Sequence, residues 1–192
     1  MKYILEHLEP KLFSWCKIEY EHISNILGKE NLIFSNIKTQ SQREYLTKLG
    51  TVYKESIRQL AETQFKHKKI CLLDSQAEKT LAPDDSKIFD MLVLGGILGD
   101  NPPKHRTILE LGLLRAEQRN MGDRQMPTDT AAYVAKEILL GKKIDEFEFI
   151  DEIEIELKKG ESVILPFRYV VVDGNILLSG KLIEYLKKKK GF

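Results

Sequence analysis

Residues 69–73 read KICLL and residues 91–100 read MLVLGGILGD, two short apolar runs that lead directly into Asp74 and into a group of glycines. Neither run alternates between apolar and polar side chains, which favours strands that are covered on both faces. Further strand candidates occupy residues 2–7 and 31–37. Since such strands belong to parallel sheets between helices, the sequence predicts an α/β fold with a mainly parallel sheet flanked by helices.

Amphipathic segments lie between these strands and are predicted to form the helices. Apolar side chains recur every three or four residues between residues 10 and 28, and again across residues 51–63. A third helix is expected over residues 128–141, where Thr128 or Asp129 can cap the first turn.

The C-terminal part of the chain has a different pattern. Residues 115–121 are expected to add one more strand, and residues 147–157 and 163–172 read as extended segments. A turn at residues 173–174 then precedes a lysine-rich helix that starts at about residue 179.

Composition limits the classes of function that fit this chain. Its 192 residues are 42% hydrophobic and contain no linker or repeat, which favours a single domain over residues 1–192. The net charge is +1, so no global charge directs the protein to nucleic acid or to a membrane. Cys16 and Cys71 lie in apolar runs without metal-ligand spacing, which predicts buried thiols and no metal site. With no signal peptide or membrane-spanning run, a soluble cytoplasmic protein is expected.

Loops that leave the strands are where a ligand is expected, because ligands of parallel sheets bind beyond the carboxyl ends of the strands. Three such loops stand out, at residues 74–76, 95–103 (GGILGDNPP) and 121–130 (MGDRQMPTDT). Glycines let a backbone approach a flat ligand closely, although the glycine pair alone also fits a tight structural turn. The sequence contains no P-loop motif and no glycine after its first strand, which disfavours nucleotide triphosphatases and ordinary dinucleotide-binding enzymes.

Several blocks of sequence together resemble one known family. The blocks are KYILEHLE at residues 2–9, CLLD at 71–74, GGILGD at 95–100 followed by PP at 102–103 and RT at 106–107, GDRQM at 122–126 followed by TDTA at 128–131, and PFRYV at 166–170. They resemble the SPOUT protein arginine methyltransferase family, which was formerly described as a predicted S-adenosylmethionine-dependent RNA methyltransferase family. The matches span nearly the whole chain in order.

This resemblance implies a trefoil-knotted α/β fold that binds S-adenosylmethionine without a metal. It also implies which residues bind the cofactor: Leu72, Leu73 and Asp74 would border the adenosine pocket, Gly95, Gly96, Ile97, Leu98 and Gly99 would wrap it, and Gly122, Met126, Thr128 and Thr130 would close it. Because adenine is flat and neutral, apolar walls with backbone donors and acceptors suffice to bind it.

An arginine acceptor needs a carboxylate, since the guanidinium stays protonated in water and is repelled by the positively charged sulfur of the cofactor. Asp100, at the end of the glycine loop, is the first candidate for this catalytic role. Asp123 and Asp129 come next, and Glu9 is a more remote candidate. A turn or capping role is the alternative for Asp100 and for Asp129.

An acidic strip is predicted in the first extended segment of the tail. Its members share one parity in the sequence: Glu146, Glu148, Glu152, Glu154 and Glu156. Such a strip would attract a basic ribosomal protein and repel RNA, although charges also protect an edge strand from aggregation. Three functions remain open: methylation of arginine in a ribosomal protein, methylation of RNA, and ribosome binding without catalysis.

Overall fold

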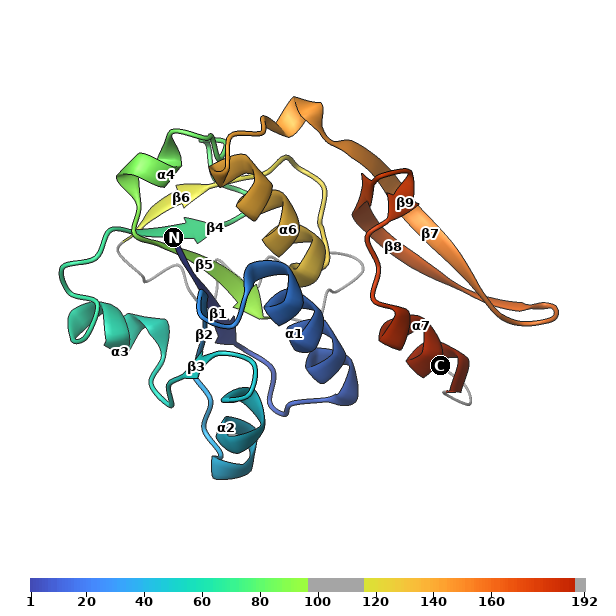
Figure 1. Cartoon of the computed structure of the whole chain (residues 1–192), viewed down its shortest axis with the longest axis horizontal. Helices are drawn as coiled ribbons and strands as arrows, with labels where there is room; N and C mark the ends of the chain where they lie inside the picture. Colours follow the sequence, from blue (N-terminus) through green and yellow to red (C-terminus); the bar gives the residue numbers. More distant parts are fainter. Residues whose placement is uncertain (97–115, 189–192) are drawn as a thin grey trace.

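A six-stranded parallel sheet forms the centre of the protein. The computed structural model describes residues 1–96 and 116–188. The strand order is β3-β2-β1-β5-β4-β6, and every strand pairs in parallel with its neighbours (Figure 1). The strands are β1 (Lys2–His7), β2 (Leu32–Ser35), β3 (Thr51–Val52), β4 (Ile70–Leu73), β5 (Met91–Gly96) and β6 (Glu117–Arg119). The mainly parallel α/β sheet predicted from the apolar runs is therefore confirmed.

Helices cover both faces of this sheet. Alternate residues of β1 divide between two buried clusters, with Leu5 in the cluster that includes side chains of α1 (Ser14–Leu27) and α6 (Thr128–Leu139). Ile4 lies in the other cluster, together with side chains of α3 (Ile57–Glu62). Two further short helices, α2 (Gln40–Leu46) and α4 (Asp85–Ile88), also lie in the described residues of this part of the chain. This division explains why the strands read as continuous apolar runs, since neither face is left to solvent.

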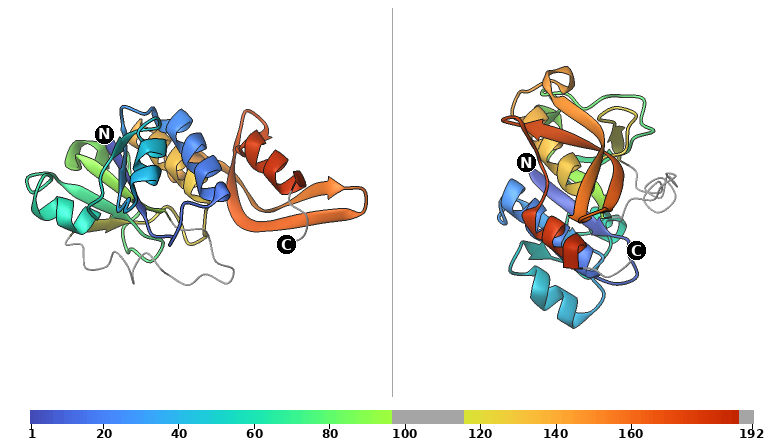
Figure 2. Two further views of the ribbon diagram at one scale, coloured as in Figure 1. Left: turned by 90° about the horizontal axis from the view of Figure 1, so that it is seen from below. Right: turned by 90° about the vertical axis from the view of Figure 1, so that its right-hand side faces the viewer.

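The C-terminal part forms a second, antiparallel sheet. A short 3-10 helix, η1 (Ile144–Glu146), leads into β7 (Glu148–Lys158), β8 (Glu161–Val172) and β9 (Asn175–Ile176), and α7 (Gly180–Lys188) follows. Figure 2 shows the β7–β8 hairpin extending away from the parallel sheet. The hairpin packs against α7 and against Trp15 and Ile18 of α1 in a third apolar cluster.

The structure corrects two predictions about the helices and adds one helix that was not predicted. The segment 51–63 is not one helix but β3 followed by α3, because the Ser56 side chain caps a helix that starts only at Ile57. The sequence patterns also missed α2, whose first turn is capped by Thr39 in the same way. Neither Thr128 nor Asp129 caps α6, because Pro127 occupies the N-cap and Asp129 is engaged elsewhere.

Other boundaries are close to those expected. The first helix begins at Ser14, a few residues after the predicted start, and the two extended segments of the tail form β7 and β8 as predicted. Within residues 1–96 and 116–188, no helix is long and apolar enough to cross a membrane. The knot stays a prediction, because the segment 97–115 lies outside the described residues.

Candidate active site

The carboxyl ends of the central strands meet at one edge of the parallel sheet. His7, the last residue of β1, pairs with Gly96, the last residue of β5, and Leu73 at the end of β4 pairs with Arg119 at the end of β6. The N-terminus of α6, which carries Thr130, is the other element predicted to border the cofactor. The strand ends therefore place the loop residues 74–76 and the end of β5 where a ligand of a parallel sheet binds.

Three buried polar atoms, two of them at this edge and the third at the start of α6, have no hydrogen-bond partner among the described residues. They are Nε2 of His7, Oδ2 of Asp74 and Oγ1 of Thr130. Leaving a buried polar group unpaired costs about 1–3 kcal/mol, so a folded protein rarely retains several of them without a purpose. Within residues 1–96 and 116–188, these three atoms are therefore open to hydrogen-bonding groups of a ligand.

Asp74 is held in place by the backbone around it. Its N–H donates to the Arg119 carbonyl at 2.9 Å, and its Oδ1 accepts from the Gln76 N–H at 2.9 Å. The carboxylate is buried, with Oδ2 unpaired. An oxygen in this position can accept hydrogen bonds from hydroxyl groups of a ligand.

The neighbouring predicted cofactor residues provide backbone and apolar surface. Leu72 is fully buried in the apolar cluster on the α3 side, while Leu73 and Met126 are partly buried against the opposite cluster. Gly122 has φ 97°, a conformation that glycine adopts without strain, and its N–H donates to Asn120 Oδ1 at 3.0 Å. Gly95 and Gly96 end β5, and Thr128 and Thr130 are buried in the first turn of α6.

Part of the predicted site lies outside the described residues. This holds for Ile97, Leu98 and Gly99 of the glycine loop, and for Asp100, the first candidate for the catalytic carboxylate. Of the other candidates, Asp123 is exposed and Glu9 is partly buried just beyond the end of β1.

Asp129 is engaged on both of its oxygens. Nδ1 of His22 donates to Oδ2 at 2.7 Å, and the N–H of Thr130 donates to Oδ1 at 2.8 Å. The side chain is buried, and its carboxylate joins α1 to α6.

A carboxylate that the sequence patterns missed lies beside Asp129. Oε1 of Glu19, in α1, accepts from the N–H of Thr128 at 3.1 Å. Burial, together with the nearby charge of Asp129, raises the pKa of Glu19 to about 8. No local pattern signals this arrangement, because the two residues that create it are 109 positions apart in the chain.

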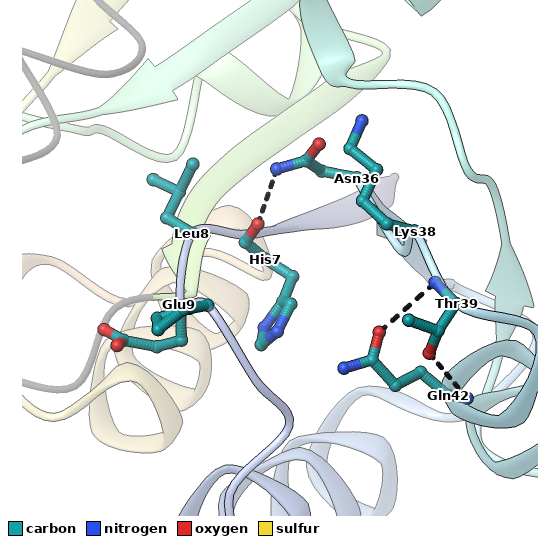
Figure 3. A pocket seen from close by; sticks show the side chains of 8 residues that line it. His7, Leu8, Glu9, Asn36, Lys38, Thr39 and Gln42 are labelled. Atoms are coloured by element: carbon teal, nitrogen blue, oxygen red, sulfur yellow. Dashed lines mark hydrogen bonds between the residues drawn. The ribbon is translucent and has the colours of Figure 1, made fainter.

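A cavity of about 310 Å³ opens next to the end of β1, between the loops that lead to α1 and α2 (Figure 3). Its lining residues are His7, Leu8, Glu9, Pro10, Asn36, Lys38, Thr39 and Gln42. Nδ1 of His7 shares a hydrogen bond with the Tyr20 hydroxyl at 2.8 Å, and Nδ2 of Asn36 donates to the His7 carbonyl at 2.7 Å. These bonds hold the His7 ring and backbone in a defined position at the wall.

Comparison with known proteins decides the family. The model of the family described as "Protein arginine N-methyltransferase SFM1-like" matches residues 2–191. This chain belongs to that family. It is 35% identical to protein arginine N-methyltransferase SFM1 of Saccharomyces cerevisiae over 98% of this chain and 95% of the yeast protein.

Solved structures agree with the family. The crystal structure of yeast SFM1 complexed with S-adenosylhomocysteine matches with a TM-score of 0.86 and 34% identity, over 96% of this chain and 94% of that one. The complex with S-adenosylmethionine matches with a TM-score of 0.86 and 35% identity, over 97% and 90%. Dual-specific Trm10 from Thermococcus kodakaraensis, at 18% identity and a TM-score of 0.57 over 76% and 96%, shares the fold alone. The fold is therefore of the SPOUT type, and the predicted family is confirmed.

Proposed function

We propose that this protein is a cytoplasmic, S-adenosylmethionine-dependent methyltransferase that modifies an arginine side chain of a basic ribosomal protein. The observation that carries the proposal is the pair of buried atoms without a partner among the described residues at the carboxyl edge and the start of α6, Oδ2 of Asp74 and Oγ1 of Thr130. Membership of the SFM1-like family, and the cofactor complexes of yeast SFM1, support the same assignment.

The residues at this edge fit the cofactor. Oδ2 of Asp74 can accept from the ribose hydroxyls, and Oγ1 of Thr130 can bond a polar group of the same ligand. Leu73 and Met126 offer apolar surface for adenine, and Gly95, Gly96 and Gly122 allow a close approach of the backbone. When bound, S-adenosylmethionine supplies an electrophilic methyl group on a positively charged sulfur. The proposal gives no role to a metal, and the described residues contain no cluster of three metal-ligating side chains.

Glu19 is the described carboxylate best placed to orient the guanidinium of an acceptor arginine. One of its oxygens is held by the N-terminus of α6, so the carboxylate has a defined direction. Burial raises the pKa of Cys16 to about 11, and the charges of Glu19 and Glu9 add to that rise, so both carboxylates lie near the start of α1. We therefore propose that Glu19 and Glu9 flank the guanidinium, with Asp100 as a further candidate and exposed Asp123 less suited.

Methyl transfer to a guanidinium forms an N–CH3 bond, breaks the S–CH3 bond and releases one proton from the attacking nitrogen. Burial and the charge of Asp129 raise the pKa of Glu19, which makes its ionised form a stronger base than an ordinary carboxylate and suited to accept that proton. Glu19 therefore serves both to orient the acceptor and to receive its proton.

The acidic strip on the hairpin fits a basic protein substrate. All five predicted carboxylates are exposed, but only four lie on β7: Glu148, Glu152, Glu154 and Glu156. Glu146 belongs to η1 rather than to the extended segment in which it was predicted. Surface charges of one sign raise the local concentration of an oppositely charged partner and oppose a partner of like charge. The strip thus favours a lysine- and arginine-rich protein over the phosphates of RNA.

Titration calorimetry with S-adenosylmethionine is the first test of this proposal. Binding that is lost in Asp74→Ala, while the variant keeps the far-ultraviolet circular dichroism spectrum of the wild type, is the expected result. No heat of binding to the wild type would favour a ribosome-binding module without catalysis.

A further inference from the structure

The cavity beside the end of β1 is separate from the residues assigned to the cofactor. It lies where β1 and β2 end, and β5 is the next strand, since His7 pairs with Gly96. The residues that precede α1 and α2 bound it on the other side. Of its lining residues, Glu9 is the one that the proposed function places beside the acceptor guanidinium. We call it the β1–β2 cavity.

One wall of the β1–β2 cavity carries a buried hydrogen-bonding atom without a partner. His7 is 4% exposed and lines the cavity, and its Nε2 has no hydrogen bond among the described residues. Figure 3 shows the His7 ring between Glu9 and Gln42, with the amide nitrogen of Gln42 on the side of the ring. A ligand that bonds Nε2 would remove the desolvation cost of about 1–3 kcal/mol that this atom carries.

The wall also defines the charge of that ligand. Burial lowers the pKa of His7, and burial raises the pKa of Tyr20 well above its usual range, so both members of the His7–Tyr20 hydrogen bond are neutral. Lys38 contributes a cation at one side and Glu9 a carboxylate at the other, and in Figure 3 the Glu9 carboxylate is turned away from Lys38. Because these two charges have opposite signs, the wall has no net charge to offset the desolvation of a charged ligand. An uncharged ligand avoids that desolvation cost.

The neutral His7–Tyr20 pair adds a second condition. Either Tyr20 donates to Nδ1, which leaves Nε2 as a donor, or Nδ1 donates to Tyr20, which leaves Nε2 as an acceptor. A primary amide both donates and accepts, and therefore matches either tautomer. A cavity of about 310 Å³ also has room for such a side chain.

We propose that the β1–β2 cavity binds an asparagine or glutamine side chain of the substrate protein that lies close in sequence to the acceptor arginine. This inference rests on the proposed arginine methyltransferase function for the source of the side chain. His7 and Gln42 form hydrogen bonds with the amide. Glu9 lines the cavity and also flanks the guanidinium, so it fixes the distance between the bound amide and the acceptor arginine.

Nuclear magnetic resonance of the full chain, saturated with S-adenosylhomocysteine, tests the cavity without any methyl transfer. The probes are the N-acetyl methylamides of glutamine, glutamate and lysine, and the readout is the 15N shift of the His7 ring. The glutamine probe should shift Nε2 more than either charged probe does. Equal shifts from all three probes, or none, would overturn the proposal.

Variants on α2 provide the matched control. Gln42→Leu should abolish the selectivity for the glutamine probe, whereas Glu44→Gln, an exposed change on the same helix outside the cavity, should leave it intact. Far-ultraviolet circular dichroism verifies that both variants keep the fold. Selectivity that persists in Gln42→Leu would remove this residue from the recognition.

A second measurement places the side chain in the substrate. Once mass spectrometry has mapped a labelled arginine, alanine replaces each flanking residue in turn, and one asparagine or glutamine position should raise KM by about tenfold, or about 1.4 kcal/mol. The absence of such a position would overturn the inference while leaving the methyltransferase function intact. A selective probe shift with no labelled arginine would instead contradict the proposed function and leave the cavity as a binding site.

Discussion

Thr130 offers a direct test of the cofactor site at the scale of one atom. Thr130→Val keeps the shape of the side chain and removes the unpaired Oγ1, so the stability of the ligand-free protein should rise by up to about 1 kcal/mol. Affinity for S-adenosylmethionine should fall by about tenfold, because the ligand loses one hydrogen bond. Thermal unfolding and titration calorimetry measure the two effects.

Thr130→Ser is the control for this experiment, since it retains the hydroxyl and should retain the affinity. A valine variant that binds the cofactor as tightly as the wild type would exclude Thr130 from the site.

Glu19 should control the pH dependence of the reaction. The pKa of Glu19 is raised to about 8 in the folded protein, so kcat/KM should rise with pH toward that value and level off above it. Glu19→Gln should remove this rise and lower kcat by about a hundredfold, while cofactor affinity is unchanged. A variant with the pH profile of the wild type would exclude Glu19 as the proton acceptor.

The carboxyl group of Glu19 also makes the free energy of unfolding depend on pH. Ionisation at high pH, which favours catalysis, lowers the stability of the folded protein. A raised pKa means that the folded state holds the proton more tightly than the unfolded state does. The corresponding stability is present below the unfolded value of 4.5 and is lost as pH rises through about 8. Glu19→Gln should therefore be more stable than the wild type above pH 8 and gain nothing below about pH 4.5. Chemical denaturation at two pH values distinguishes these outcomes.

Sequence patterns anticipated some of these residues and not others. Asp74, Gly122 and Thr130 follow strands or open a helix, so their position could be predicted from the order of the elements. Glu19 and His22 looked like ordinary polar residues of an amphipathic helix. Their role depends on the packing of α1 against α6, which a local pattern cannot reveal.

The β7–β8 hairpin is the element that should select the substrate. Converting Glu152, Glu154 and Glu156 together to Gln should raise KM for a basic ribosomal protein and leave cofactor binding unchanged, because the strip acts by attraction at the surface. Steady-state kinetics at low ionic strength, where screening is weakest, shows the effect best.

A matched triple variant distinguishes the effect of the hairpin charges on KM from the effect of the net charge of the protein. Glu30, Glu44 and Glu62 are exposed on other elements, and their conversion to Gln removes the same number of charges. It should leave KM unchanged. An equal rise in KM for both triple variants would mean that net charge, and not the hairpin, determines affinity.

Elements with continuous apolar runs could be predicted, while short polar ones could not. Strands β4 and β5 are covered on both faces and show it in their composition. The boundary between β3 and α3 depends instead on the Ser56 cap, and the start of α2 depends on the Thr39 cap. Each cap rests on a few side-chain hydrogen bonds in a polar stretch, where no apolar pattern marks the helix start.

At the scale of the whole molecule, we propose that the two sheets fold as a single domain. Trp15, the single tryptophan of the chain, lies in the apolar cluster that joins α1 to the hairpin and α7, and its ring meets that of Tyr185 edge to face. Its fluorescence therefore reports this junction, while far-ultraviolet circular dichroism reports the whole fold. The two denaturant transitions should coincide. A fluorescence transition at lower denaturant would divide the chain into two units.

The acceptor is the central claim, and one measurement tests it most directly. The purified protein is incubated with a fractionated ribosomal extract and with S-adenosylmethionine that is labelled in its methyl group. One half of the product is then digested with protease and the other half with nuclease. The label should resist nuclease, be released by protease, and be recovered on arginine after complete hydrolysis. Label that resists protease and is released by nuclease would contradict the arginine assignment and identify RNA as the acceptor.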